Sequence, residues 1–195
     1  MATGMAKNQK ELQSRRRNPF EPPQDGALSW FLLWSVLGAF AIAAGARVTV
    51  PFEPVPMTLQ TLAVLGVGGL LGGRIGASAA GLYLLLIVLG LPLLADGAKA
   101  GGAAFLELKS GGYVVGFIPA AFIAGFSSGG VFSSLLIMAL AHVVILGIGT
   151  SWLAAHIGGN PAVEHGLRPF LWGAVVKTFV AAALVQHFAV RRRSR

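Results

Sequence analysis

The 195-residue chain is 55% hydrophobic and 11% charged, and its mean hydropathy of +0.73 excludes an ordinary soluble domain. Its net charge is +8, but the basic residues gather near the two chain ends, which indicates membrane topology and argues against nucleic-acid binding. The chain has no cysteine and no Gly-x-x-x-x-Gly-Lys-Ser/Thr motif, which excludes thiol chemistry and assigns any ATP-driven work to another subunit.

Residues 1–27 are polar and basic and contain three prolines, which predicts a disordered cytoplasmic tail. The first apolar run, residues 28–46, carries no charge. At about 1.5 Å per residue it is long enough to cross about 30 Å of hydrocarbon. A secretory signal is the competing interpretation, but this run is longer than the apolar core of a signal, so we expect a membrane anchor.

A proline-rich elbow follows the first span. Pro51, Pro54 and Pro56 exclude a helix and hold the chain extended at the membrane surface. Thr58, Gln60 and their neighbour Thr61 then bring hydrogen-bonding side chains to the start of the next span. For Thr58 and Gln60, helix capping and ligand contact are both open interpretations.

The rest of the chain divides into five further apolar segments. Residues 110–163 contain no Asp, Glu, Lys or Arg, and the Ser-Ser-Gly-Gly cluster at 127–130 divides this stretch in two. The expected spans after the first are residues 58–73, 75–94, 112–126, 131–155 and 169–190, with Pro169 in a first helical turn. We therefore expect an all-α integral membrane protein, with six transmembrane helices in one compact bundle over residues 28–190.

Six spans place both termini on one side of the membrane. Ten of the 15 Lys and Arg residues lie near the termini or at Arg74, so the positive-inside rule makes this side cytoplasmic. Residues 191–195 then form a second basic cytoplasmic tail. The three external connections are expected at residues 47–57, 93–111 and 156–168.

Lys177 is the only formally charged residue within an expected span. It lies about 12 Å below the external end of the sixth helix. A charge at this depth is costly and usually marks a site or has a partner, although the side chain can also extend outward to the headgroups. Gly173, one turn earlier on the same face, leaves space above the ammonium. We expect an anionic ligand to bind there from outside.

The external loop before the fourth span is a second candidate site. It is long and rich in glycine, so its backbone can approach a ligand closely, and Gly112 lies at its end. Asp96 can accept hydrogen bonds from a ligand, but capping or simple solvation is an equal alternative. Tyr113 either stacks on a ligand ring or anchors the chain at the membrane interface.

No catalytic or metal site is expected. His142 and His156 do not have a metal-ligand spacing, so a hydrogen bond to a neighbouring helix is the expected role of a buried histidine here. An intramembrane enzyme would need paired carboxylates, a Ser/His dyad or a metal cluster at membrane depth, and the sequence shows none of these. No cofactor is expected either. A structural or assembly protein is the other alternative, but it would not need Lys177.

Five segments carry a family resemblance. They are residues 55–61 (Val-Pro-Met-Thr-Leu-Gln-Thr), 70–76 (Leu-Leu-Gly-Gly-Arg-Ile-Gly), 90–92 (Gly-Leu-Pro), 111–117 (Gly-Gly-Tyr-Val-Val-Gly-Phe) and 169–177 (Pro-Phe-Leu-x-Gly-x-x-x-Lys). In order and spacing they resemble the BioY family, the biotin-binding S components of energy-coupling-factor (ECF) vitamin importers. The resemblance covers roughly residues 38–185.

This resemblance implies a transporter subunit of a prokaryotic plasma membrane that captures biotin with high affinity near its external face. It implies a transmembrane coupling subunit and two ATPase subunits as partners. A solitary, homo-oligomeric biotin transporter stays open, because some members are thought to act without a dedicated module. Lys177 matches the family lysine and suits the carboxylate of biotin, whereas Asp96, Gln60 and the glycine-rich backbone suit its ureido ring.

The chain departs from the family pattern at two places. Many relatives carry Asp three residues before the lysine, where this chain has Ala174, and Leu-Lys-Ser at 108–110 replaces the usual Gly-Pro-Thr. Either Asp96 substitutes for the missing carboxylate, or the ligand is a different vitamin or small anion.

Overall fold

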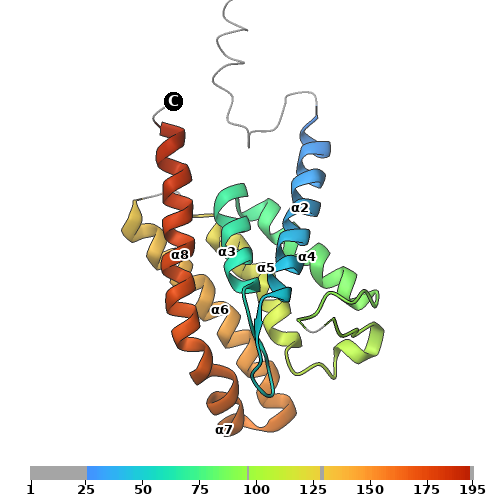
Figure 1. Cartoon of the computed structure of the whole chain (residues 1–195). Coiled ribbons are helices and arrows are strands. Elements are labelled where there is room, and N and C mark those ends of the chain that lie inside the picture. The colour runs from blue at the N-terminus through green and yellow to red at the C-terminus, as the bar shows by residue number, and fades with distance from the viewer. Residues whose placement is uncertain (1–25, 96, 128–129, 194–195) are drawn as a thin grey trace, which may run out of the picture.

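The computed structural model describes residues 26–95, 97–127 and 130–193. Most of this part of the chain is helical (Figure 1), as the all-α class predicts. The expected tail over residues 1–27 lies almost wholly outside the described residues. The elements are, in chain order, α2 (Ala27–Arg47), β1 (Thr49–Val50), β2 (Met57–Thr58), α3 (Gln60–Leu71), α4 (Gly73–Val88), η1 (Gly102–Phe105), α5 (Gly111–Ala124), α6 (Val131–Ile157), α7 (Gly159–Ala162), η2 (Val163–Leu167) and α8 (Arg168–Arg193).

Each expected span contains one main helix, but these helices differ in length. Within the described residues, α2, α6 and the continuous run Gly159–Phe188 are long and apolar enough to cross a membrane. By contrast α3, α4 and α5 have 12, 16 and 14 residues. At about 1.5 Å per residue a helix of this length falls short of about 30 Å of hydrocarbon. The helices thus confirm the expected segments, whereas length alone supports three of them as spans.

Glycine and proline set the ends of α4. Gly72 has φ +92°, a left-handed conformation that glycine adopts without steric cost, and it separates α3 from α4. Gly90, with φ +88°, and Pro92 follow the other end. The prediction that this helix continues to residue 94 was wrong, because a left-handed glycine and the residue before a proline both interrupt helical geometry.

The expected connection at residues 156–168 does lie between the two long helices α6 and α8, and it is itself largely helical in the structure. After Gly158, α7 and the π-helical η2 lead directly into α8. Pro169 lies in the first turn of α8, as predicted. The wider η2 turn comes directly before this proline, at the place where its missing N–H and its ring would disturb a regular α-helix.

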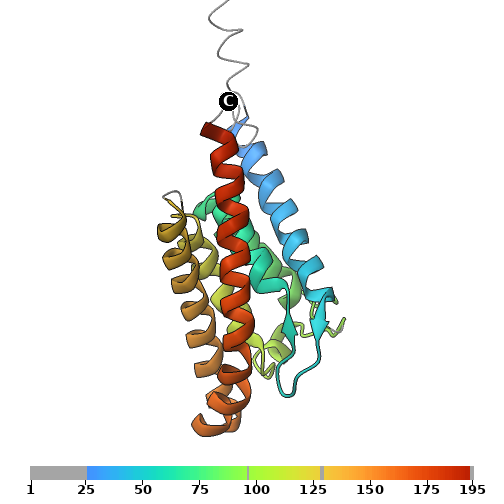
Figure 2. The same cartoon turned by 60° about the vertical axis from the view of Figure 1, so that its left-hand side comes forward.

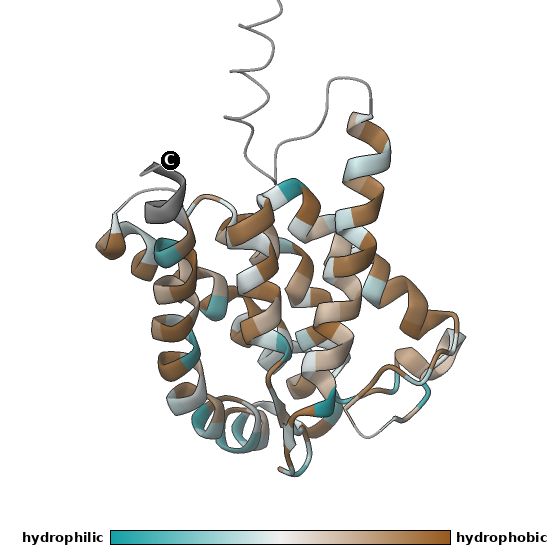
Figure 3. Cartoon of the chain, turned by 45° about the horizontal axis from the view of Figure 1, so that its top comes forward, coloured by the Kyte–Doolittle hydropathy of each residue, from teal (hydrophilic) through white to brown (hydrophobic). Residues whose placement is uncertain are grey.

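Large apolar side chains face outward along the long helices. Phe40 on α2, Phe132 on α6 and Trp172 on α8 are 65%, 74% and 80% exposed. Figure 3 shows this apolar colouring on the outer faces of the helices. Helices that are apolar on all sides belong in a hydrocarbon environment, because soluble proteins rarely expose such surfaces. The chain is therefore a membrane protein.

Figures 1 and 2 agree on where the elements end. The start of α2 and the end of α8 lie at one end of the molecule. The β1–β2 hairpin and α7 lie at the opposite end. An even number of passes produces this arrangement, and it gathers the hairpin and the turn before α8 at one surface.

Candidate ligand-binding site

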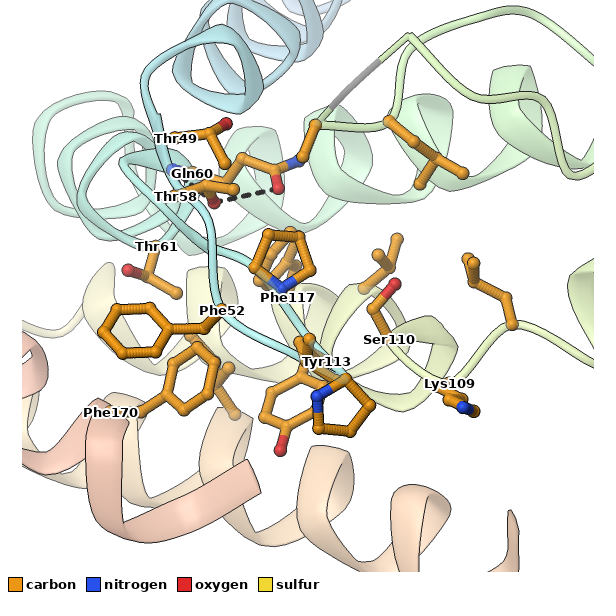
Figure 4. A pocket seen from close by; sticks show the side chains of 18 of the residues that line it. Thr49, Phe52, Thr58, Gln60, Thr61, Lys109, Ser110, Tyr113, Phe117 and Phe170 are labelled. Carbon is orange, nitrogen blue, oxygen red and sulfur yellow. Dashed lines mark hydrogen bonds between the residues drawn. The ribbon is translucent and has the colours of Figure 1, made fainter. Parts of the chain in front are cut away.

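A cavity of about 550 Å³ lies beside the hairpin (Figure 4). Its volume falls within the range of about 300–1,000 Å³ that is typical of small-molecule sites. The hairpin and the start of α3, the loop after α4, and α5, α6 and α8 all contribute to its lining. Segments that are far apart in the sequence therefore meet around one cavity.

The proline-rich elbow forms one wall of the cavity. Thr49 pairs with Thr58, and Val50 with Met57, in an antiparallel ladder. Residues 51–56 connect the two strands and all of them line the cavity. No helix forms in this stretch, as the prolines predict, but the chain bends at residues 53–55 and reverses its direction, so the prediction that it is held extended was wrong. Because the ladder fixes β2, it also fixes the direction of the Thr58 carbonyl.

Lys177 extends from α8 into this cavity. Its Nζ donates a hydrogen bond to the backbone oxygen of Thr58 at 2.6 Å. The side chain is half-buried and lines the cavity, so it does not simply extend to the headgroups. Lys109 lines the same cavity, but its side chain is exposed. Lys177 is thus the more buried of the two cations.

Thr58 and Gln60 line the cavity and belong to one hydrogen-bond network. The Thr58 hydroxyl donates to Gln60 Oε1 at 3.0 Å, as Figure 4 shows, and accepts the backbone N–H of Gln60 at 3.2 Å. The Gln60 amide nitrogen donates to the Tyr83 hydroxyl at 2.5 Å. Tyr83 in turn donates to the Leu93 carbonyl at 3.0 Å. The N-cap residue of α3 is Leu59, which has no side-chain cap bond, so neither Thr58 nor Gln60 is the cap residue. The Thr58 hydroxyl still accepts one N–H of the first turn, and the amide of Gln60 is held in place by its partners.

Tyr113 contributes its ring to the cavity wall. Its hydroxyl donates to the Gly166 carbonyl at 2.7 Å, and its ring stacks on Phe170 with centroids 5.7 Å apart. The ring lies directly against Gly149, where a Cβ would be only 2.2 Å from the ring. Tyr113 is 6% exposed, so it packs inside the bundle and does not serve as an interfacial anchor.

Two of the expected site residues, Gly112 and Gly173, are not among the residues that line the cavity. A Cβ on Gly112 would lie 2.2 Å from Cβ of Trp152, and one on Gly173 would lie 2.9 Å from the sulfur of Met57. Both glycines therefore allow close packing between elements. Asp96 lies outside the described residues, and its role stays a prediction.

His142 and Thr61 line the cavity but were not expected as ligand contacts. His142 Nδ1 lies 2.8 Å from the Thr178 hydroxyl oxygen on α8, which confirms the expected bond to a neighbouring helix. The remaining ring nitrogen, Nε2, and the Thr61 hydroxyl are buried and have no partner among the described residues. The sequence signal that could have identified His142 as a site residue is its depth within the span. Because α6 and α8 are antiparallel neighbours, this depth places His142 level with Lys177.

The cavity suits a small amphipathic anion. The rings of Phe52, Phe117 and Phe170 offer apolar contact, and Lys177 offers a cation. In the part of the chain that the structure describes, no three His, Asp or Glu side chains gather in a way that would hold a metal ion. The arrangement can bind and orient a ligand by charge, hydrogen bonds and apolar contact.

Comparisons with known proteins agree on one family. A family model described as the BioY family matches residues 20–194. The chain is 36% identical over 144 residues to the "Probable biotin transporter BioY" of Pyrococcus horikoshii, covering 74% of this chain and 86% of that protein. It is 33% identical over 168 residues to the "Biotin transporter BioY" of Rhizobium etli, covering 78% of this chain and 89% of that protein.

A solved structure has the same fold. With a TM-score of 0.73 and 26% sequence identity, the chain resembles the crystal structure of "the S-component for biotin from an ECF-type ABC transporter", covering 85% of this chain and 94% of that chain. The resemblance seen in the five sequence segments is thereby confirmed over most of the chain. The chain belongs to the BioY family.

Proposed function

We propose that this chain captures biotin at the external face of a prokaryotic plasma membrane, as the high-affinity S component of an ECF-type transporter. The observation that carries this proposal is Lys177, which extends from a membrane helix into a cavity with aromatic walls. The names of the relatives and the structural likeness support it. The chain performs no chemistry on the ligand.

The chemistry of biotin fits the cavity. Its valerate carboxylate binds the ammonium of Lys177. This ammonium has three N–H groups and donates one of them to the Thr58 carbonyl, so two are left for the ligand. Its bicyclic ring packs against the apolar and aromatic walls of the cavity. Its ureido group takes hydrogen-bonding side chains, and Asp96 stays a proposed contact for it. Ala174 also lines the cavity, and its methyl group supplies no hydrogen bond there.

The proposed topology has six passes, with Arg74 and both basic chain ends in the cytoplasm. The hairpin, α7 and the cavity then face outward, where the vitamin arrives. In this assembly a transmembrane coupling subunit and two ATPase subunits drive release inside, because this chain has no Gly-x-x-x-x-Gly-Lys-Ser/Thr motif of its own. A solitary oligomer is the alternative assembly.

The test is calorimetric biotin binding to purified, detergent-solubilised protein, comparing wild type with Lys177→Ala. Loss of a charge-assisted hydrogen bond weakens binding by about 10- to 100-fold. Lys99→Ala is the matched control, because Lys99 is exposed and does not line the cavity. It should bind like wild type.

Two results would change the proposal. A wild type that ignores biotin but binds another vitamin would keep the fold and change the ligand. Equal weakening by Lys99→Ala and Lys177→Ala would show a general effect of positive charge in place of a defined contact.

A further inference from the structure

His142 is the most buried polar side chain among the described residues that line the cavity, with 3% of its surface exposed. Its Nδ1 meets the Thr178 hydroxyl, whereas Nε2 is buried without a hydrogen-bond partner in the described ranges. A buried hydrogen-bonding atom that stays unpaired destabilises a fold, so such atoms are rare in native proteins. At a cavity wall, a bound ligand can supply the missing partner.

The contact with Thr178 determines what Nε2 offers. A neutral imidazole carries one N–H, and a hydroxyl can donate or accept. If Nδ1–H donates to Thr178, then Nε2 is an acceptor. If the Thr178 hydroxyl donates to Nδ1, then Nε2–H is a donor. His142 can therefore meet either the N–H or the C=O of a cyclic urea, which presents both groups side by side.

His142 and Lys177 come from different helices and have different hydrogen-bond partners. Lys177 Nζ bonds the Thr58 carbonyl on the hairpin, whereas the contact between Thr178 and His142 is on the side of α6. Ala174, one helical turn before Thr178, adds only a methyl group to the lining. A ligand whose carboxylate lies at Lys177 therefore presents another part of its structure to His142.

We propose that His142 is a specificity-determining contact, whose Nε2 hydrogen-bonds the ureido ring of biotin while Thr178 positions the imidazole. The inference rests on the proposed function, because it takes biotin as the ligand and Lys177 as the partner of its carboxylate. A second buried atom in the same cavity, Thr61 Oγ1, also has no hydrogen-bond partner within residues 26–95, 97–127 and 130–193, and it adds hydrogen-bonding capacity from α3.

Two variants distinguish the roles of the two ring nitrogens of His142. The shorter amide of His142→Asn places its polar atoms near Nδ1, where they can bond Thr178, and leaves nothing at Nε2. The longer amide of His142→Gln places them near Nε2. We expect biotin affinity to fall about 10-fold in His142→Asn and less than about 3-fold in His142→Gln. If His142 served only to join α6 to α8, the order would be reversed, because that contact is made through Nδ1.

A second ligand separates the two ends of biotin. Titrations with biotin and with its carboxamide, which lacks the negative charge, are compared in wild type, His142→Asn and Lys177→Ala. The loss in His142→Asn should be the same for both ligands, because the ureido ring is unchanged. The loss in Lys177→Ala should be largest for biotin itself.

The outcomes separate the inference from the function on which it rests. A wild type that does not bind biotin overturns both. Binding by wild type with unchanged affinity in His142→Asn, as expected if Nε2 only meets water, overturns the inference alone. A loss in His142→Asn confined to biotin places the carboxylate at His142 and also overturns it. If His142→Asn does not fold, His142→Leu replaces it against His142→Gln.

Discussion

Tyr83 tests whether the hydrogen-bond network beside the cavity holds the fold and the site together. This side chain is fully buried on α4. Its hydroxyl accepts from the Gln60 amide and donates to the Leu93 carbonyl, which joins α3 to the loop after α4. Tyr83→Phe removes both bonds and leaves a buried amide and a carbonyl without their partner.

The size of the effect follows from the number of bonds lost. At about 1 kcal/mol for each hydrogen bond, Tyr83→Phe lowers the free energy of unfolding by about 2 kcal/mol. For a chain of this size that corresponds to a fall in Tm of about 4–8 °C. The other tyrosine of the chain, Tyr113, provides the matched control, because its hydroxyl donates to one backbone carbonyl, that of Gly166. Tyr113→Phe should lower Tm by about half as much.

The assay is thermal unfolding in detergent, followed by tryptophan fluorescence, with biotin affinity measured on the same samples. Because Gln60 lines the cavity, Tyr83→Phe should also weaken biotin binding, by about 3-fold. A smaller fall in Tm for Tyr83→Phe than for Tyr113→Phe would refute the proposed role of this network in stability. Unchanged biotin affinity in Tyr83→Phe would show that this hydrogen-bond network does not contribute to ligand binding.

Two further predictions concern the cavity wall. Thr61→Val removes a hydroxyl without a partner among the described residues while keeping the shape of the side chain, so calorimetry should show about 3-fold weaker biotin binding. Its Tm should rise slightly, because a buried unpaired hydroxyl is lost. Trp152→Phe removes the 2.9 Å hydrogen bond from the indole N–H to the Leu108 carbonyl. This bond holds a cavity-lining loop in place. Displacement of labelled biotin should then show faster dissociation, and an unchanged rate would mean that this loop does not retain the ligand.

Most of the helices could be predicted because their signals are local. Apolar runs, the Gly72 turn and the Ser-Gly cluster at 127–130 each act within a few residues, so hydropathy and turn chemistry were sufficient. The errors came from segments where signals compete. Gly90 and Pro92 end a helix inside an apolar run, whereas the prolines at 51–56 exclude a helix but belong to a hairpin loop that bends.

The site was harder to predict, because its residues meet only in three dimensions. The depth of Lys177 in an apolar helix was a one-dimensional signal, and the structure places this lysine in the cavity. Gly112 and Gly173 showed that a small residue leaves space, but the sequence does not say what fills it. Trp152 and Met57 fill it here. His142 required knowledge of which helix packs against α8.

The environment of Lys177 explains why an anion is the expected ligand. Its recorded partner is a backbone carbonyl, which accepts a hydrogen bond but carries no net charge. Within the described residues the recorded ion pair joins Arg168 to Glu164, and the two glutamates at the cavity, Glu53 and Glu107, have exposed side chains. A half-buried ammonium that has no acidic partner among the described residues is costly, and a bound carboxylate would lower that cost. A neutral or cationic ligand would not lower the cost of the half-buried ammonium. The same lysine therefore favours capture of anions and disfavours other solutes.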